Sequence, residues 1–449
     1  MQLILREYQT KIVNFIRSHP KCLVFCGCGM GKTSACLSAV KELGLKHVLV
    51  VAPLATGLNA WPSEVEQWGF DFVIRQFCSQ TLAKRKKLLA APLDPVKPTI
   101  DVINYESVKF LYEANQKYDL IIADECTRLK HYRTRSGSSS ARFVYKIAAK
   151  TERFVGLTGT PTPNGLTDIW GQYVFVGDEL GKSFSAFAER FCDKITFYSI
   201  PGACKYVVKK EHIQTIADLA RSKVINIKPE QYFDLDKPLF YNMQFSLDAK
   251  NLNDYMELKR KEFLEDPNIL PANAAVKMAK LLQLANNFIY LNDDGTQTPS
   301  YYAQTKIGAL KDLLEDLNGE PAIICYHFQA DLKLLLEIKG TVTLSPQSIK
   351  AWNAGKVQYL LINPAQAAHG ISLQHGGRNM IFYSMDWNLE QYEQVIERIG
   401  PMRQLQSGYK RVVRIYHLIA RDTIEDNIYK ALAAKEDVQK NLLKLLDKT

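Results

Sequence analysis

The sequence contains no apolar stretch long enough to span a bilayer, since no run of about 18 apolar residues occurs in its 449 positions. Its first residues, MQLILREYQ, place Arg6 and Glu7 too early for the apolar core of a secretory signal. It also has no tandem repeat and no low-complexity segment. These absences argue against membrane, secreted and fibrous proteins, and predict a globular protein of the cytoplasm with no membrane partner.

The sequence also lacks the cysteine spacing of a metal site. Its nine cysteines are scattered, without repeated CxxC pairs. Cys22, Cys26 and Cys28 lie close together, but no second pair of cysteines or histidines follows at the spacing of a zinc site. We therefore expect reduced thiols, as is usual in the cytoplasm.

Charge is distributed unevenly along the chain. Residues 1–240 hold 33 Lys and Arg against 23 Asp and Glu, whereas the rest holds 24 of each, so the first half carries the whole net charge of +10. Basic runs occur at 84–87 (KRKK) and 128–135 (RLKHYRTR). Such an excess favours a polyanionic partner through phosphate contacts. A solvated basic surface explains the composition equally well, so the choice between these two interpretations depends on the sequence motifs.

The first half of the chain alternates short apolar runs with amphipathic stretches. The runs predict strands at 22–27, 47–53, 99–105, 118–125 and 153–160, and a helix follows the first strand from about Lys32 to Leu43. Continuous apolar strands separated by helices are typical of a parallel sheet covered on both faces. This half is therefore predicted to be a doubly wound α/β domain.

The second half repeats the pattern after a different intervening region. Residues from about 184 to 287 are predicted to be mainly helical, and apolar strands return at 321–328, 357–364, 379–385 and 412–420. A long amphipathic helix follows the last of these. We expect a first α/β domain over 1–240 with the start of a helical insertion, a helical linker over 241–305, and a second α/β domain over 306–449.

The strongest local motif is CGCGMGKT at 26–33, between a predicted strand and a predicted helix. A glycine-rich turn backed by a helix N-terminus suits a nucleoside triphosphate. Lys32 would contact the β and γ phosphates, and the Thr33 hydroxyl would bind Mg²⁺. Cys26 occupies the place of the first glycine of the general pattern, while the rest is intact. The nucleotide-binding candidates are Gly27, Cys28, Gly29, Met30, Gly31, Lys32 and Thr33.

A pair of carboxylates follows another strand of the same predicted sheet. Asp124 and Glu125 begin the motif DECT at the end of LIIAD. An aspartate after an apolar strand is where ATPases with a phosphate-binding loop hold Mg²⁺, and a neighbouring carboxylate can activate water. Together with Lys32, this pair predicts a catalytic site for ATP hydrolysis.

At this point the sequence resembles the superfamily 2 helicases, and above all their Swi/Snf-like branch. In the first half the similar segments are LREYQ (5–9), VVAPLATGLNAWPSEVEQW (50–68), INYES (103–107), DECTRLKH (124–131) and LTGTP (157–161), with Thr127 where histidine is usual. In the second half they are IICYHF (323–328), NPAQAAHGISLQ (363–374), MDWN (385–388), QVIERIGPMRQ (394–404) and the closing HLIARDTIEDNIYKAL (417–432). The resemblance covers nearly the whole chain, in the family's order.

The resemblance implies two RecA-like domains with ATP and Mg²⁺ bound at their interface, and a C-terminal brace helix. It implies that Gln9 reads adenine and that Gly370 contacts the nucleotide. Trp61, Trp68 and Trp387 are expected to pack in cores or between domains rather than to stack on bases. The implied DNA-binding residues are Pro53, Leu54, Asn104, Tyr105, Thr160, His327, Phe328 and His369.

The motif at 394–404 departs from the family pattern, which has two arginines three residues apart. Arg398 matches the first, but Pro401 stands at the place of the second. Such arginines stabilise charge on the transferred phosphoryl group. We expect a shifted loop in which Arg403 takes the second role; otherwise Arg398 acts alone or the ATPase is slow.

The resemblance implies an ATP-dependent DNA helicase or translocase. The compact length is similar to that of phage-encoded members, which implies work on replication or recombination intermediates by a monomer in the host cytoplasm, on single-stranded, duplex or branched DNA. The alternatives are a duplex translocase that does not separate strands, an RNA helicase, and a nucleic-acid-binding module with a weak ATPase. The last is left open by Cys26, Thr127 and Pro401.

Overall fold

The computed structural model describes residues 4–133, 137–196, 204–264, 271–293, 296–367 and 371–446. The chain packs as two compact units. Unit 1 comprises Met1–Lys194, Tyr206–Asp234 and Lys435–Thr449, and unit 2 comprises Ile195–Lys205 and Leu235–Ala434.

Unit 1 is built on a parallel sheet in the order β3-β4-β2-β5-β6-β1-β9. The strands are β1 (Lys21–Cys26), β2 (His47–Ala52), β3 (Val73–Gln76), β4 (Thr99–Asn104), β5 (Leu120–Asp124), β6 (Arg153–Thr158) and β9 (Val224–Ile227). Every residue of β2, β4 and β5 is buried, as expected for strands covered on both faces. The polar residues that follow these strands therefore gather at one edge of the sheet.

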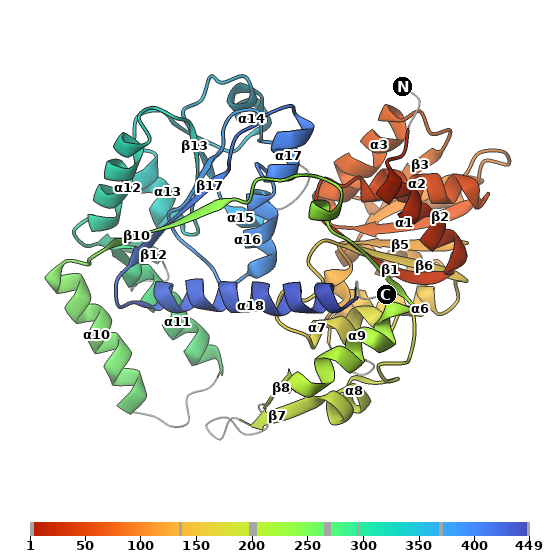
Figure 1. The fold of residues 1–449 in the computed structure, drawn as a ribbon, viewed down its shortest axis with the longest axis horizontal. Coiled ribbons are helices and arrows are strands. Elements are labelled where there is room, and N and C mark those ends of the chain that lie inside the picture. Colours follow the sequence, from red (N-terminus) through yellow and green to blue (C-terminus); the bar gives the residue numbers. More distant parts are fainter. Residues whose placement is uncertain are drawn as a thin grey trace. The chain divides into compact units, whose positions relative to one another are not determined.

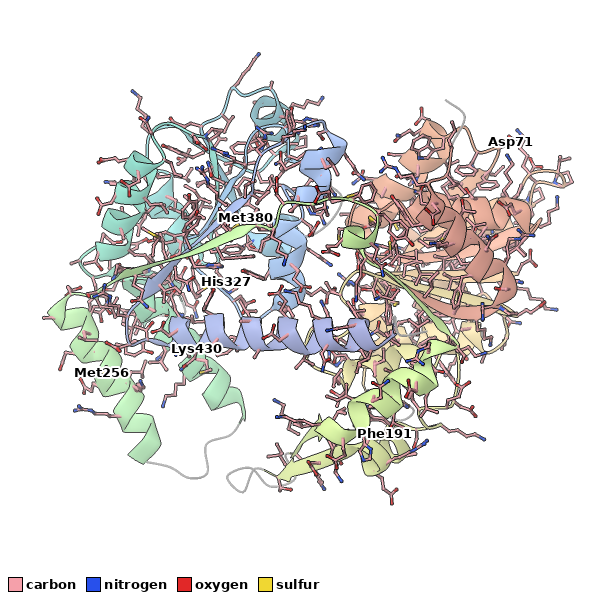
Figure 2. All side chains as sticks on the ribbon, in the orientation of Figure 1. Asp71, Phe191, Met256, His327, Met380 and Lys430 are labelled. Carbon is pink, nitrogen blue, oxygen red and sulfur yellow. The ribbon has the colours of Figure 1, made fainter. Side chains whose placement is uncertain are left out.

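Helices and a small sheet complete unit 1. The helices are α1 (Glu7–Ser18), α2 (Lys32–Glu42), α3 (Trp61–Gln67), α4 (Leu82–Ala90), α5 (Lys109–Glu113), α6 (Ser139–Ala148), α7 (Asp168–Tyr173), α8 (Phe184–Phe191) and α9 (Ile213–Arg221). Short helical turns are η1 (Thr56–Ala60), η2 (Tyr105–Ser107), η3 (Cys126–Leu129), η4 (Lys210–His212) and η5 (Pro229–Gln231). Strands β7 (Cys192–Thr196) and β8 (Cys204–Val208) pair as a separate sheet. Phe191 is at the end of α8 (Figure 2). It belongs to the apolar core of this unit.

Unit 2 has its own parallel sheet, in the order β10-β17-β16-β13-β15-β14. The strands are β10 (Leu239–Phe245), β13 (Ala322–Cys325), β14 (Thr341–Thr343), β15 (Tyr359–Ile362), β16 (Asn379–Phe382) and β17 (Arg414–Ala420). Ile323 and Met380 belong to one apolar cluster, while Ile324 and Ile381 belong to another. Because neighbouring residues of a strand face opposite sides, both faces of this sheet are covered.

The helices of unit 2 include a hairpin beside the sheet. They are α10 (Ala249–Leu264), α11 (Pro271–Ala285), α12 (Thr305–Asp316), α13 (Gln329–Leu335), α14 (Pro346–Asn353), α15 (Pro364–Ala367), α16 (Leu389–Ile396), α17 (Pro401–Gln406) and the start of α18 (Ile424–Leu446). Helices α10 and α11 pack on each other and extend beyond the sheet (Figure 1). Strands β11 (Phe288–Asp293) and β12 (Thr296–Tyr301) form an antiparallel pair.

The predicted fold class, two doubly wound parallel-sheet α/β domains, is confirmed, and the strands predicted in both halves are present. The prediction that 184–287 is mainly helical is wrong in part, because β9 joins the sheet of unit 1 and β10 joins that of unit 2. Both are edge strands, and β10 is largely exposed, so neither has the continuous apolar run of a central strand.

The domain limits also differ from those expected. Residues 241–305 do not form a separate linker, since they pack within unit 2. The division between the units falls inside α18, whose residues from Lys435 onward belong to unit 1. Within the described ranges, none of the helices combines the length and the apolar character needed to cross a membrane.

Candidate active site

The phosphate-binding loop has the backbone that its glycines predict. Gly29 and Gly31 have φ values of 73° and 69°, a region that side chains disfavour. Helix α2 begins directly after the loop, at Lys32. The Lys32 ammonium donates to the carbonyl oxygens of Cys26 at 2.8 Å and Gly27 at 3.2 Å. The lysine therefore lies over the loop, where phosphate oxygens can replace these carbonyls as acceptors.

The charge of Lys32 is held by its surroundings. Burial lowers the pKa of Lys32, but the nearby Cys28, Cys26, Glu125 and Asp124 act in the opposite direction and raise it overall. The ammonium is thus kept protonated next to two carboxylates and at the N-terminus of a helix. This arrangement favours a polyanionic ligand such as a triphosphate.

Gln9 connects helix α1 to the same loop. Its side-chain amide donates to the carbonyl oxygens of Met30 and Gly31 and to the Ser34 hydroxyl, each at 3.4 Å. Its oxygen accepts from the backbone N–H of Arg6 at 2.9 Å. A Cβ at position 31 would collide with the Gln9 amide, so this contact also requires glycine there. The structure therefore places the expected adenine reader directly against the loop.

Asp124 ends β5 and is 4% exposed. The indole N–H of Trp61 donates to its Oδ2 at 3.0 Å, and the Tyr105 hydroxyl donates to its backbone oxygen at 2.8 Å. Burial raises the pKa of Asp124, while the Trp61 hydrogen bond and the charge of Lys32 oppose that rise. Trp61 is buried, as predicted, but sequence reasoning missed its hydrogen bond to the candidate metal ligand.

Glu125 has a left-handed backbone, with φ 49° and ψ 57°. This conformation is uncommon for a residue with a side chain and costs free energy, so it is maintained by the surrounding fold. Its carboxylate accepts from the Thr158 hydroxyl at 3.5 Å. The turn thus directs the candidate base toward the end of the neighbouring strand, β6.

The segment 157–164, which comprises the end of β6 and the loop after it, is linked to the carboxylates by hydrogen bonds. The Thr158 hydroxyl accepts from the backbone N–H of Thr160 at 3.0 Å. Gln172, on α7, donates to the Pro161 carbonyl at 2.6 Å and accepts from the Cys126 thiol at 3.3 Å. Sequence reasoning missed Gln172, because no motif includes it.

The two candidate arginines of unit 2 lie close to one another in the chain. They form hydrogen bonds with two residues that are neighbours in the sequence, Ile371 and Ser372. Arg398 is 5% exposed and donates to the carbonyl oxygens of Gln394 at 3.0 Å and Ile371 at 3.3 Å. Arg403 is half-buried and donates to the Ser372 hydroxyl at 2.7 Å. Pro401 is the first residue of α17, a position that suits proline, and it sets Arg403 in the first turn of this helix.

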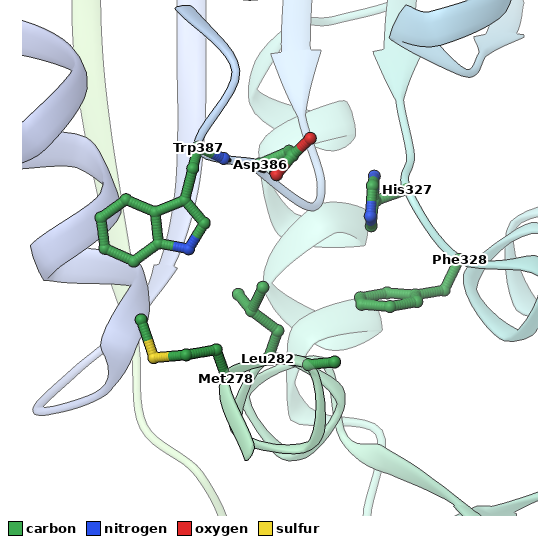
Figure 3. A pocket seen from close by; sticks show the side chains of 7 residues that line it. Met278, Leu282, His327, Phe328, Asp386 and Trp387 are labelled. Carbon is green, nitrogen blue, oxygen red and sulfur yellow. Dashed lines mark hydrogen bonds between the residues drawn. The ribbon is translucent and has the colours of Figure 1, made fainter. Parts of the chain in front are cut away.

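Two of the predicted DNA-binding residues line a cavity of about 420 Å³ in unit 2. His327 is exposed and Phe328 is half-buried, and Figure 3 shows both rings facing the cavity opposite Trp387 and Met278. Leu282, Ala279 and Asp386 complete the lining. The backbone N–H of His327 donates to the Ser384 hydroxyl at 2.7 Å, which fixes the start of this loop.

The other predicted DNA-binding residues differ in their exposure. Leu54 is 44% exposed, whereas Pro53, Asn104 and Thr160 are buried. Tyr105 is 2% exposed, so its placement favours a role in fixing Asp124 over a surface contact. His369 and Gly370 lie outside the described residues.

A family model of the SNF2-related domain matches residues 8–292. The chain belongs to the SNF2-related family. It is thus a helicase-type ATPase of the Swi/Snf-like branch of superfamily 2, with the tandem RecA-like folds of that family, and the predicted resemblance is confirmed.

Individual known proteins are similar to this chain over most of its length, but over different shares of their own. The putative protein p41 of Acyrthosiphon pisum secondary endosymbiont phage 1 is 36% identical over 458 residues, with 98% of each chain covered. DNA repair and recombination protein RAD54B of Gallus gallus is 24% identical over 477 residues, which cover 91% of this chain and 50% of RAD54B. The solved SWI2/SNF2 ATPase core of Sulfolobus solfataricus in complex with dsDNA is 18% identical and covers 100% of this chain and 96% of its own, with a TM-score of 0.43.

Proposed function

We propose that this SNF2-related chain is a DNA motor that hydrolyses ATP on unit 1 and moves along DNA at forks and branched intermediates. The observation that carries the proposal is the group formed by Lys32, Asp124, Glu125 and Thr158 at one edge of the sheet of unit 1. Lys32 begins α2, after the loop that follows β1, and the other three residues lie at the ends of β5 and β6 or next to them. Together they supply one cation, two carboxylates and a hydroxyl around a phosphate-binding loop.

The donor set of unit 1 fits a nucleotide with Mg²⁺. Thr33, the second residue of α2, is half-buried, and Asp124 offers a carboxylate near Lys32. Hydroxyl and carboxylate oxygens are the ligands that Mg²⁺ accepts beside phosphates. When bound, Mg²⁺ supplies charge neutralisation at the β and γ phosphate oxygens.

Each of the protein groups then has its own role in hydrolysis. Lys32 leaves its two carbonyl acceptors and binds phosphate oxygens, while Thr33 and Asp124 hold the metal. Glu125 accepts a proton from the attacking water, and Thr158 keeps the Glu125 carboxylate in place through the hydroxyl contact at 3.5 Å. In unit 2, Arg403 supplies charge to the phosphates in place of the arginine lost at Pro401, together with Arg398.

We propose that DNA is the nucleic acid along which the protein moves, for two reasons. Unit 1 contains nearly all of the residues that carry the basic excess, and Lys84, Lys86 and Lys87 are exposed on α4. RAD54B, one of the relatives, is named for DNA repair and recombination. Contacts to phosphates would dominate, so we expect little sequence preference.

The deciding experiment measures the ATPase rate without nucleic acid and with single-stranded DNA, duplex DNA, a branched junction and RNA. We expect DNA to raise the rate about tenfold or more. Lys32→Ala should abolish turnover, whereas Lys41→Ala, which changes an exposed lysine on the same helix, should not. A strand-displacement assay on the best substrate then separates unwinding from duplex translocation.

Two outcomes would overturn the proposal. Turnover that RNA stimulates and DNA does not would make the chain an RNA helicase. No turnover on any substrate would leave a nucleotide-regulated binding module, in line with the departures at Cys26, Thr127 and Pro401.

A further inference from the structure

Helix α18 is part of both units, and its first turns are anchored in unit 2. Ile428 and Leu432 lie in the apolar core of that unit. Glu425 forms a fully buried ion pair with Lys306 at 2.6 Å, and its second oxygen accepts from the backbone N–H of Ala420 at 2.9 Å. A buried charge pair of this kind is costly to separate, so this end of the helix is firmly held.

The last turns of α18 are anchored in unit 1. Leu442 and Leu446 belong to its apolar core. The carbonyl of Leu443 accepts from the Asn226 amide at 3.0 Å. Gln439, one turn earlier, is 5% exposed, and its side-chain oxygen accepts from the backbone N–H of Thr162 at 3.3 Å. The helix therefore reaches the loop after β6 through one buried side chain.

Thr162 lies in the loop that connects to the catalytic carboxylate. It is fully buried, and its carbonyl accepts from the backbone N–H of Gly165 at 3.1 Å. Two residues earlier, Thr160 is bonded to Thr158, whose hydroxyl donates to Glu125. A buried amide without an acceptor is unfavourable, so loss of the Gln439 oxygen would move the loop or expose the Thr162 amide to water.

We propose that Gln439 is a positioning residue for ATP hydrolysis, which holds the segment 157–164 so that Thr158 keeps Glu125 in place. The inference rests on the proposed function, because it assumes that Glu125 acts on ATP. A helix that only filled the core of unit 1 would need no acceptor at position 439.

The test uses the full chain and three variants. Gln439→Met keeps the length of the side chain but removes the acceptor, Gln439→Glu keeps an oxygen, and Val438→Ala alters the exposed neighbour on the same helix. Hydrogen exchange at the Thr162 amide is measured without nucleotide, and kcat and KM for ATP are measured with and without DNA. Thermal melting of each variant checks the fold.

For Gln439→Met we expect exchange at Thr162 to be about tenfold faster. The DNA-stimulated kcat should fall about five- to tenfold, while KM for ATP and the melting temperature stay near those of the unaltered chain. Gln439→Glu should lie closer to the unaltered chain in both measurements, and Val438→Ala should match it.

Unchanged exchange at Thr162 in Gln439→Met would overturn the proposal whatever the activity. If DNA stimulates the unaltered chain but kcat of Gln439→Met is unchanged, the proposal is also wrong. The same holds if kcat of Gln439→Met falls only as far as its melting temperature explains, or if Gln439→Glu has faster exchange or a lower kcat than Gln439→Met. Failure of the proposed function is distinguishable, because it would appear as an unaltered chain that DNA does not stimulate.

Discussion

Unit 1 gathers its candidate catalytic groups at the ends of neighbouring strands, whereas unit 2 carries its candidate arginines after its strands, on a loop and a short helix. In unit 1 the groups bind one another, as in the contact of Thr158 with Glu125 and of Trp61 with Asp124. In unit 2, Arg398 and Arg403 bind Ile371 and Ser372 of their own unit. The difference teaches that the candidate hydrolytic groups are held by contacts with one another in unit 1, whereas the candidate arginines would have to exchange partners to take the proposed role.

The largest effect is expected when the candidate base of unit 1, Glu125, is replaced. Glu125→Gln keeps the size of the side chain but removes the base, so kcat should fall about 10⁴-fold while nucleotide still binds. Steady-state turnover and equilibrium binding of a fluorescent nucleotide check this. Glu113→Gln, an exposed control in the same unit, should remain active. Retention of more than a tenth of the activity by Glu125→Gln would remove Glu125 from the mechanism.

The arginines of unit 2 come next. Arg403→Ala should lower kcat about 10³-fold with little change in melting temperature, because Arg403 is half-buried. Arg398→Ala should lower both, because its buried guanidinium holds two backbone carbonyls. The exposed Arg421 provides a neutral control. If Arg403→Ala stays active and Arg398→Ala does not, a single arginine serves the site.

The units also differ in how they hold buried titratable groups. In unit 1, Asp101 is fully buried, and although burial raises its pKa, hydrogen bonds from His47 and Arg75 lower it overall. Its stabilising contribution is therefore lost only as the pH falls below its ordinary value of 3.8. In unit 2, burial lowers the pKa of His417 to about 4, against an ordinary value of 6.5.

The third prediction uses this difference. Because the folded-state pKa of His417 is depressed, the stability that it contributes is present above pH 6.5 and is lost as the pH falls toward 4. The loss is about 2 kcal/mol at pH 5. His417→Gln, which keeps an acceptor for the Tyr392 hydroxyl, should escape it, so its stability relative to the unaltered chain should improve from pH 7.5 to pH 5.

Denaturant titrations at both pH values measure that relative stability. The comparison must be made between the two chains, because burial also raises the pKa of Asp331 to about 6, and this carboxyl titrates in the opposite sense. Equal pH dependence in the two chains would show that His417 does not become protonated in the folded unit at pH 5.

The smallest effect is expected when the hydrogen bond from Tyr105 to Asp124 is removed. Tyr105→Phe removes the hydroxyl that donates to the Asp124 carbonyl, which should cost about 1 kcal/mol of unfolding free energy and lower kcat by a few-fold. Urea unfolding and ATPase assays measure the two effects. Tyr112→Phe, at a half-buried ring, is the matched control. If Tyr112→Phe lost more stability and activity than Tyr105→Phe, the effect would come from general packing and not from the hydrogen bond to Asp124.

The sequence predicts the central strands well, because an apolar run buried on both faces needs no knowledge of its neighbours. It misses β10, whose residues are mostly exposed and whose strand character comes from pairing with β17. The same limit applies to β9, a four-residue strand that pairs with β1, 201 positions earlier in the chain. These elements depend on a partner that local pattern does not contain.

The candidate site divides in the same way. Lys32, Asp124 and Glu125 are predicted by local motifs, and the structure brings them together around the loop. Trp61 and Gln172 are not predicted as partners, because their contacts join residues 63 and 46 positions apart. One signal for Tyr105 was available: it follows β4, and the ends of parallel strands meet at one edge of a sheet. The role of Arg403 stays a prediction.

The passage of α18 into unit 1 has a consequence for how the protein is made on the ribosome. Leu442 and Leu446 belong to the core of unit 1, yet they are translated after every residue of unit 2. Nascent unit 1 can form its sheet early, but its core closes only when this helix is released from the exit tunnel. Under the role proposed for Gln439, ATP turnover would begin only in chains that already carry the second unit, so an abandoned, half-translated chain would not consume ATP.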